Sequence, residues 1–329
     1  MQEFIKVLNF IITFTIFTFY AIIINIFRIE GLIMTRRFFI KFLSALGLSF
    51  MLPNKIKATP LKDADFQMII LTDSQCVDYN VFKRTADTAV RHFPNADIAT
   101  VIGDLVDNGE AEYQWRAWRN AARKFLKDKI FLPVMGNHEC YNHDWLNYIP
   151  AHYLKQFDFP DNGTNFQGYF YSFDYFNVHF LIINTQMYEL EDLVPDLFET
   201  QENWLRNDST KLPWKIVLMH KDIYDYGQDK IDYVGEKFMD LFDELDIDLV
   251  LTGHLHTYRR RKPFKQHKPL YILCGVSGDQ RYTEPERSVD AVSATPLDNY
   301  MILEANSQIL KIRCYDIEGN MIDDVSLKK

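Results

Sequence analysis

Five short polar motifs follow apolar runs in this 329-residue chain, and their order constrains the fold more than any other feature. Each motif begins where a run long enough for a buried strand ends, so it places oxygen or imidazole ligands in the loop after a strand. The motifs are Asp73-Ser74-Gln75, Gly103-Asp104-Leu105-Val106-Asp107, Gly136-Asn137-His138-Glu139, His220 and Gly253-His254-Leu255-His256. Carboxylates, an amide and imidazoles together form a donor set that suffices for two adjacent divalent or trivalent metal ions.

The first three motifs alternate with helical patterns. Helices are predicted over Asn80–His92 and Glu110–Lys127, and Trp115 and Trp118 lie on one face of the second helix, as core residues do. Strands are predicted at Phe66–Leu71, Asp97–Ile102 and Ile130–Met135. An order of strand, ligand, helix, strand, ligand is typical of an α/β fold whose chemistry lies at the carboxyl ends of its strands.

The second half of the chain predicts a further sheet. Two alternating segments, Gly168–Tyr175 and Val178–Asn184, predict a hairpin in which His179 is structural. The remaining strands are expected at Trp214–Met219, Asp248–Thr252, Leu270–Gly275, Tyr300–Glu304 and Ile309–Tyr315, with helices near Gln201–Asn207 and Val234–Leu245. We expect two mixed sheets packed face to face with helices outside, which is a four-layer α-β-β-α sandwich.

At these motifs the chain resembles the calcineurin-like metallophosphoesterases, and more narrowly their purple acid phosphatase-like branch. The family pattern reads Asp-x-His, Gly-Asp-x-x-Asp, Gly-Asn-His-Glu/Asp, a single His and Gly-His-x-His. The similarity runs from Phe66 to Gly278. It implies the same four-layer sandwich, two metal ions (Fe, Mn or Zn) and hydrolysis of phosphomonoesters or phosphodiesters by a metal-activated hydroxide.

The resemblance also implies a role for each motif residue. Asp104 would bridge the two ions. His138 would protonate the leaving oxygen or stabilise the phosphate, and Asp107 would hold His138 in the correct tautomer. Asn137, His138 and Tyr258 would contact the substrate. The remaining ligands would be Asp73, Gln75 and His256 for the first ion, and Asn137, His220 and His254 for the second.

Gln75 departs from the family pattern, which has histidine at this position. An amide oxygen can bind a hard metal ion, but more weakly than imidazole. Purple acid phosphatase-like proteins tolerate another residue here, and some of them carry a tyrosine in the second motif, where this chain has Val106 and Asp107. We therefore expect a first metal site that is weaker, completed by water or selective for a different ion, without the purple iron chromophore. The alternative is a degenerate, non-catalytic metal-binding protein of the cell envelope on the same fold.

The charge is unevenly distributed along the chain. Residues 1–58 carry seven basic and two acidic residues, whereas the whole chain has 36 basic and 45 acidic ones and a net charge of −9. Residues 59–329, the predicted metallophosphoesterase domain, therefore carry a net charge of −14. An acidic body disfavours binding to long polyanions, so we expect no nucleic-acid partner. The charge says little about the small phosphoester substrate that the resemblance implies, because bound metal cations would set the local potential.

Residues 1–58 form a predicted export or membrane segment. The nearly unbroken apolar run Val7–Phe27 is long enough to span a bilayer. A different pattern begins at Met34, where Arg36-Arg37 precede an apolar stretch that leads to a cleavage point at Ala58, as in a twin-arginine signal. Three interpretations stay open: translation starting at Met34 with an export signal, a membrane anchor at residues 7–27, or a buried hairpin. The first two place the domain outside the cytoplasm, in the periplasm, envelope or medium.

Other residues leave alternatives open. Tyr141, Asn142 and His143 follow the third motif and are expected to border the substrate. Arg259–Lys262 follow the last motif and predict either a solvated basic turn or a phosphate-steering patch. The four cysteines lack metal-site spacing and predict either small buried residues or one disulfide pair; they are Cys76, Cys140, Cys274 and Cys314.

Overall fold

The computed structural model describes residues 61–329 except for 76–78, 146, 209, 225–229 and 279–290. Its described strands form two mixed sheets, one of six strands and one of seven. The predictions for residues 1–58 and for Cys76 concern residues outside those that the structure describes. Among the described residues, no helix combines the length and the apolar character needed to cross a membrane.

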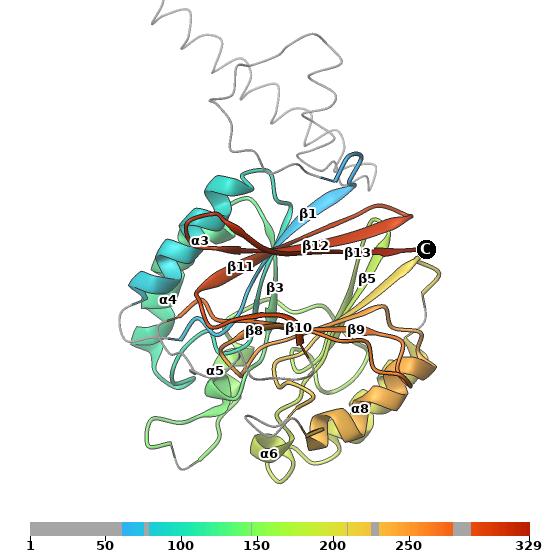
Figure 1. Ribbon diagram of the computed structural model, residues 1–329. Helices are drawn as coiled ribbons and strands as arrows, with labels where there is room; N and C mark the ends of the chain where they lie inside the picture. Colours follow the sequence, from blue (N-terminus) through green and yellow to red (C-terminus); the bar gives the residue numbers. More distant parts are fainter. Residues whose placement is uncertain (1–60, 76–78, 146, 209, 225–229, 279–290) are drawn as a thin grey trace, which may run out of the picture. The chain divides into compact units, whose positions relative to one another are not determined.

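The first sheet has the strand order β13-β12-β11-β1-β2-β3. Figure 1 shows its strands β1, β11, β12 and β13 above β8, β9 and β10 of the second sheet. Strands β1, β2 and β3 are parallel to one another, whereas β11, β12 and β13 are joined to β1 by antiparallel pairing. Its strands are β1 (Phe66–Leu71), β2 (Ile98–Ile102), β3 (Ile130–Val134), β11 (Asn299–Ala305), β12 (Ile309–Asp316) and β13 (Met321–Lys328). The first three motifs thus leave the same edge of one sheet.

The second sheet has the order β10-β8-β9-β7-β6-β5-β4, and its central strands β5, β6, β7 and β9 are parallel. The hairpin of β4 and β5 is present as predicted. The strands are β4 (Tyr171–Tyr175), β5 (Val178–Ile182), β6 (Trp214–Leu218), β7 (Leu249–Thr252), β8 (Tyr258–Arg261), β9 (Leu270–Cys274) and β10 (Ala291–Thr295).

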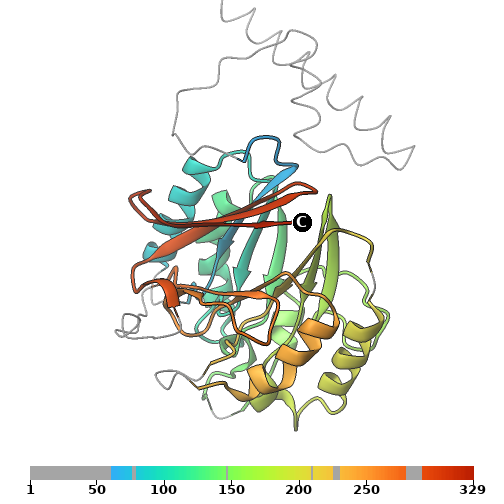
Figure 2. The ribbon, with the colours of Figure 1, turned by 45° about the vertical axis from the view of Figure 1, so that its right-hand side comes forward.

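Helices cover the outer faces of the two sheets, as Figure 2 shows for the orange helix α8 on the second sheet. Helices α3 and α4 pack on the first sheet, and the buried Trp115 and Trp118 of α4 lie in that layer as predicted. The helices are α3 (Asn80–His92), α4 (Glu112–Leu126), α5 (Ala151–Leu154), α6 (Met187–Leu190), α7 (Leu197–Asn207) and α8 (Tyr233–Glu244), with a 3₁₀ turn at His138–Cys140. The four-layer α-β-β-α sandwich is confirmed.

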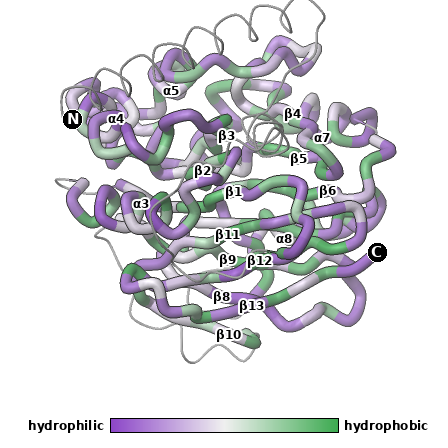
Figure 3. Tube along the Cα trace, turned by 90° about the horizontal axis from the view of Figure 1, so that it is seen from above, coloured by the Kyte–Doolittle hydropathy of each residue, from purple (hydrophilic) through white to green (hydrophobic). Residues whose placement is uncertain are grey.

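The apolar runs are continuous because both faces of the central strands are buried. In β1, Met68 and Ile70 face the other sheet, whereas Ile69 and Leu71 face the helices. In Figure 3 the hydrophobic stretches, in green, follow the strands in the middle of the view. The three described cysteines, Cys140, Cys274 and Cys314, are buried and not in disulfides.

The prediction of a solvated basic turn at Arg259–Lys262 is wrong, whereas the phosphate-steering patch stays a prediction. Residues up to Arg261 belong to strand β8, and two of the arginines are paired within the fold. Arg260 binds Asp323 through two nitrogens, and the fully buried Arg261 pairs with Asp222. The charges of Arg260 and Arg261 therefore stabilise the fold.

Candidate metal centre

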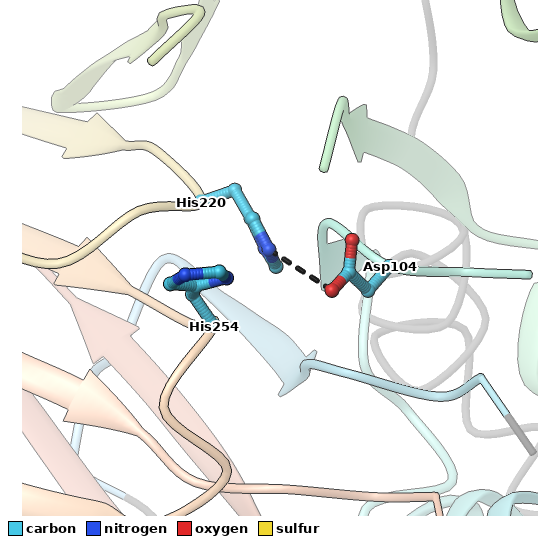
Figure 4. Close-up of side chains that lie close together, drawn as sticks. All are labelled: Asp104, His220 and His254. Carbon is cyan, nitrogen blue, oxygen red and sulfur yellow. Dashed lines mark ion pairs between the residues drawn. The ribbon is translucent and has the colours of Figure 1, made fainter. Parts of the chain in front are cut away.

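The five motif loops converge at one place between the two sheets. Two groups of ligand atoms form there, and the atoms of each group lie within 4.8 Å of one another. Asp104 belongs to both groups, and Figure 4 shows its carboxylate facing His220, with His254 beside that ring. The groups are Asp104 with His220 and His254, and Asp73 with Asp104 and His256. The sharing of one carboxylate by two clusters is the arrangement that a dinuclear site requires.

In the first of these groups, a hydrogen bond to a backbone carbonyl fixes the orientation of the His220 ring. Its Nδ1 lies 2.9 Å from the carbonyl oxygen of Ile102, so Nδ1–H donates there. Its Nε2 then points at Asp104 Oδ2 and at Asn137 Oδ1, both 3.1 Å away. The His254 ring lies beside it, with the ring centroids 5.1 Å apart. A histidine whose Nδ1–H is hydrogen-bonded to a backbone carbonyl is oriented to bind a metal ion through Nε2.

In the second group, His256 Nε2 lies 3.3 Å from Asp73 Oδ1. The Gln75 amide completes the group, since its nitrogen is 3.1 Å from His256 Nε2 and 3.3 Å from Asp104 Oδ2. Its Oε1 is buried and has no hydrogen-bond partner among the described residues. The two ends of an amide are nearly interchangeable in shape, so a half-turn directs this oxygen at the other ligands. The donor set therefore fits a metal ion with Gln75 as a ligand.

Four of the candidate ligand residues adopt a backbone conformation that non-glycine residues rarely use. The φ angles are positive at Asp73 (48°), Asp104 (51°), His254 (74°) and His256 (50°). Such a conformation costs of order 1–3 kcal/mol per residue and persists only where the surroundings impose it. The strand ends thus bend sharply enough to turn each ligand inward.

Two motif glycines make room for these ligands. Gly103 has a φ of 76°, and a Cβ there would lie 2.2 Å from His220 Nδ1. A Cβ at Gly136 would lie 2.2 Å from Asp104 Oδ1. No other residue fits either position, because any side chain would overlap a ligand.

The pKa values of the clustered groups are strongly perturbed. Burial alone would raise the pKa of Asp104, but the charges of His220 and His138 outweigh it and hold that pKa well below its usual range. Burial lowers the pKa of His220, yet Asp104 raises it to about 9. Burial and the charge of His220 lower the pKa of His254 to about 3. Opposed shifts in one buried cluster are typical of a functional site.

His138 lies at the edge of the cluster. Its Nε2 is 3.9 Å from Asp104 Oδ2, and its backbone N–H donates to Asp104 Oδ1 at 3.0 Å. Its Nδ1 is 2.7 Å from the backbone carbonyl of Asp107, whereas the Asp107 carboxylate is 3.7 Å away. The tautomer is therefore set by the main chain of Asp107, and the predicted role of its carboxylate is corrected.

Tyr258 does not join the cluster. Its side chain is buried in the core between the sheets, and its hydroxyl donates to Asp323 at 2.8 Å. The structure therefore corrects its predicted contact with substrate. His179 is structural as expected, since it is buried and pairs with Asp174 at 2.5 Å.

Glu139 is a positioning residue that the sequence analysis missed. Its buried carboxylate accepts the backbone N–H groups of Asp104, Leu105, Val106 and Gly136 at 2.7–3.2 Å. Burial and the nearby Asp104 charge raise its pKa to about 7. One side chain thus holds the turns of two motifs. The only indication of this role in the sequence is that Glu139 belongs to the Gly136–Glu139 motif, which also contains candidate metal ligands.

A cavity of about 300 Å³ lies beside the cluster and reaches His254. Tyr188, Tyr233 and Lys221 line it, and the Lys221 amine donates to both carboxylate oxygens of Glu189 and to the Tyr233 hydroxyl, at 2.8–2.9 Å. The cavity wall was not predicted either, because its contacts join separate segments. It gives the cluster room for a ligand.

The calcineurin-like phosphoesterase family model matches residues 67–258. This chain therefore belongs to the calcineurin-like phosphoesterase family. Its curated relatives include purple acid phosphatase 21 of Arabidopsis thaliana, which is 25% identical over 251 residues, or 69% of this chain and 54% of that protein. The chain spans about half the length of the curated relatives it matches. These relatives support the purple acid phosphatase-like branch.

Solved structures show the same fold. The purple acid phosphatase PPD1 from yellow lupin (Lupinus luteus) seeds superposes with a TM-score of 0.67 at 20% identity, covering 80% of this chain and 53% of that one. GAP50, described as the anchor in the inner membrane complex of Plasmodium, has a TM-score of 0.62 at 14% identity, with coverage of 81% and 89%. At such identities the likeness concerns the fold alone.

Proposed function

We propose that this protein is a metal-dependent phosphohydrolase that uses two ions, Fe, Mn or Zn, to hydrolyse small phosphomonoesters or phosphodiesters. The observation that carries the proposal is the Asp104 carboxylate, which is shared by two ligand groups and lies 3.9 Å from His138 Nε2. The curated relatives named as phosphatases support it. The net charge of −14 in residues 59–329 favours a small substrate over nucleic acid.

Each ligand has a place in this proposal. Asp104 would bridge the ions; the first would also be held by Asp73, Gln75 and His256, and the second by Asn137, His220 and His254. Bound cations would supply hydroxide near neutral pH and neutralise charge on the phosphoryl group.

The chain's own contribution to the chemistry is orientation and proton transfer. The strand ends hold the candidate ligands, and Asn137 and His138 would contact the bound phosphate. Because Nδ1–H of His138 donates to the Asp107 carbonyl, Nε2 is the nitrogen that exchanges a proton with the leaving oxygen.

The test is the turnover of a panel of phosphomonoesters and phosphodiesters by metal-loaded protein, together with metal analysis. His138→Ala is expected to lower kcat by roughly 10²- to 10⁴-fold, as the loss of a general acid does, with metal content unchanged. His152→Ala, which removes a histidine paired with Glu112 at 3.7 Å, is the matched control and should keep full activity. Bound metal without turnover of any ester would favour the non-catalytic alternative.

We also infer that the domain is exported. The support is the sequence pattern from Arg36-Arg37 to Ala58, with the apolar run at residues 7–27 as the alternative, a membrane anchor. The mass of the protein recovered from the cell envelope or medium distinguishes a cleaved export signal from a retained membrane anchor. A chain beginning after Ala58 supports the export signal, whereas a chain that retains residues 7–27 in the membrane fraction supports the anchor.

A further inference from the structure

Two aromatic rings pack against His138, the proposed proton donor. The Tyr141 ring lies 5.4 Å from the His138 ring at an interplanar angle of 90°, and the Trp145 ring lies 5.6 Å away at 81°. Both contacts are edge-to-face, the geometry that aromatic rings favour. If His138 protonates the leaving oxygen, as the proposed function has it, the departing group lies next to this wall.

Trp145 differs from the other four tryptophans of the chain. It is 45% exposed, whereas Trp115, Trp118 and Trp214 are buried and Trp204 is partly buried against the core. It is backed by Tyr141, with ring centroids 5.1 Å apart. The exposed part of the Trp145 ring beside His138 therefore offers an apolar surface to a ligand.

The backbone holds this ring in place at some cost. Trp145 has a φ of 63°, a conformation that bulky residues rarely adopt. Its N–H donates to the Asn142 carbonyl at 3.1 Å, and the side chain of Asn142 accepts from the N–H of Asn147 at 3.2 Å. Asn108, in the second motif loop, also donates to the Asn142 carbonyl. The loop is thus fastened to the turn that follows Asp107.

We propose that Trp145, backed by Tyr141, is the platform on which a planar aromatic leaving group packs, so that the preferred substrates are aryl phosphoesters. The wall carries no charge, unlike the cavity beside His254, where Lys221 and Glu189 are paired. Stacking on a fixed ring costs little conformational entropy, and it discriminates planar groups from small alkyl groups. The inference rests on the proposed function.

The experiment measures binding of two non-hydrolysable probes to the metal-loaded protein by calorimetry. Benzylphosphonate carries an aromatic ring and ethylphosphonate does not, while both have a CH₂ in place of the ester oxygen. Trp145→Ala is expected to raise the Kd of benzylphosphonate by roughly three- to tenfold, and that of ethylphosphonate by less than about twofold. Trp145→Phe keeps a ring and should retain most of the preference. Benzylphosphonate should also change the tryptophan fluorescence of the wild type but not of Trp145→Phe.

The outcomes separate this inference from the proposed function. Equal Kd values for the two probes in the wild type, unchanged in Trp145→Ala, overturn the platform and leave the hydrolase standing. Failure of both phosphonates and of inorganic phosphate to bind contradicts the proposed function itself. Tyr188→Ala alters the exposed ring at the cavity; a selective loss of benzylphosphonate there, and not in Trp145→Ala, would place the aromatic group in the cavity and overturn the platform.

Discussion

At the scale of single residues, Gln75 makes the two ligand groups chemically unequal. The group that contains Gln75 offers one imidazole, His256, whereas the group around Asn137 offers two, His220 and His254. Nitrogen donors favour Zn²⁺, while oxygen donors favour harder ions such as Mn²⁺. The two positions are therefore expected to differ in both affinity and metal preference.

Gln75→His tests this difference directly. The new imidazole should raise the affinity of the weaker site for Zn²⁺ by at least about tenfold, since even outer partners of a ligand change affinity by 10–100-fold. Zinc titration of the metal-free protein by calorimetry gives the two affinities separately. Gln75→Ala is the matched control and should weaken the same site, because it removes the amide oxygen. Identical titrations for all three proteins would mean that residue 75 does not contact the ion.

At the scale of elements, one carboxylate joins the two sheets. Asp323 of β13 in the first sheet accepts from Arg260 Nε at 2.7 Å and Nη2 at 3.0 Å, and from the Tyr258 hydroxyl at 2.8 Å. Both partners belong to β8 of the second sheet. Burial would raise the pKa of Asp323, but the hydrogen bonds from Arg260 and Tyr258 outweigh it and lower that pKa. The contact therefore stabilises the packing of the sheets only while Asp323 is ionised.

The pH dependence of stability follows from that lowered pKa. A carboxyl group whose pKa is lower in the folded state contributes stability above its unfolded pKa of about 4, and that contribution is lost as the pH falls through the folded value. Asp323→Asn should cost about 1–2 kcal/mol at pH 7, a value discounted for solvent screening at the sheet edge. Urea unfolding of both proteins from pH 7 to pH 3 should show the difference shrinking at the acid end. A difference that stays constant with pH would rule out the charged contact.

At the scale of the whole molecule, the strands that deliver ligands could be predicted, whereas the contacts between distant segments could not. Buried parallel strands such as β1 and β6 are continuous apolar runs, so their ends and the motifs after them stand out. Strands β8 and β13 contain charged residues instead. The partial burial of Arg260 in a strand is explained only by its ion pair with Asp323, which lies 63 positions away in the sequence. Tyr258 was misplaced for the same reason. The sequence pattern does not show which acidic side chain will pair with a buried arginine.

The motifs predict the candidate ligand set, but they do not predict the residues that support it. The carboxylate of Glu139 collects backbone N–H groups from two loops, and that role depends on how the loops approach one another. The cavity between Tyr188 and Tyr233 likewise exists only after α6 and α8 have packed. Residue type and order fix which groups can bind a metal ion, whereas their orientation is a property of the folded chain.

Metal binding should stabilise the whole domain, because the strand ends of both sheets meet at the ligands. An ion that binds only the folded state at about 1,000 times its Kd adds roughly 4 kcal/mol. For a domain of this size, that stabilisation raises Tm by roughly 10 °C. Calorimetry in a chelator and after addition of Mn²⁺ or Zn²⁺ measures the difference, and metal analysis should give two ions per chain.

Asp104→Asn and Asp107→Asn separate the shared ligand from its neighbour in the same motif. Asp104 belongs to both ligand groups, whereas the Asp107 carboxylate lies outside them. The first variant should therefore lose metal-dependent stabilisation and most of the bound metal, because a neutral amide cannot bridge two cations as a carboxylate does. The second should keep both ions and the full rise in Tm. Comparing each variant with and without metal removes the effect of the substitution on the metal-free fold. If Asp104→Asn still bound two ions and gained the same stability from them, the shared-carboxylate centre would be refuted.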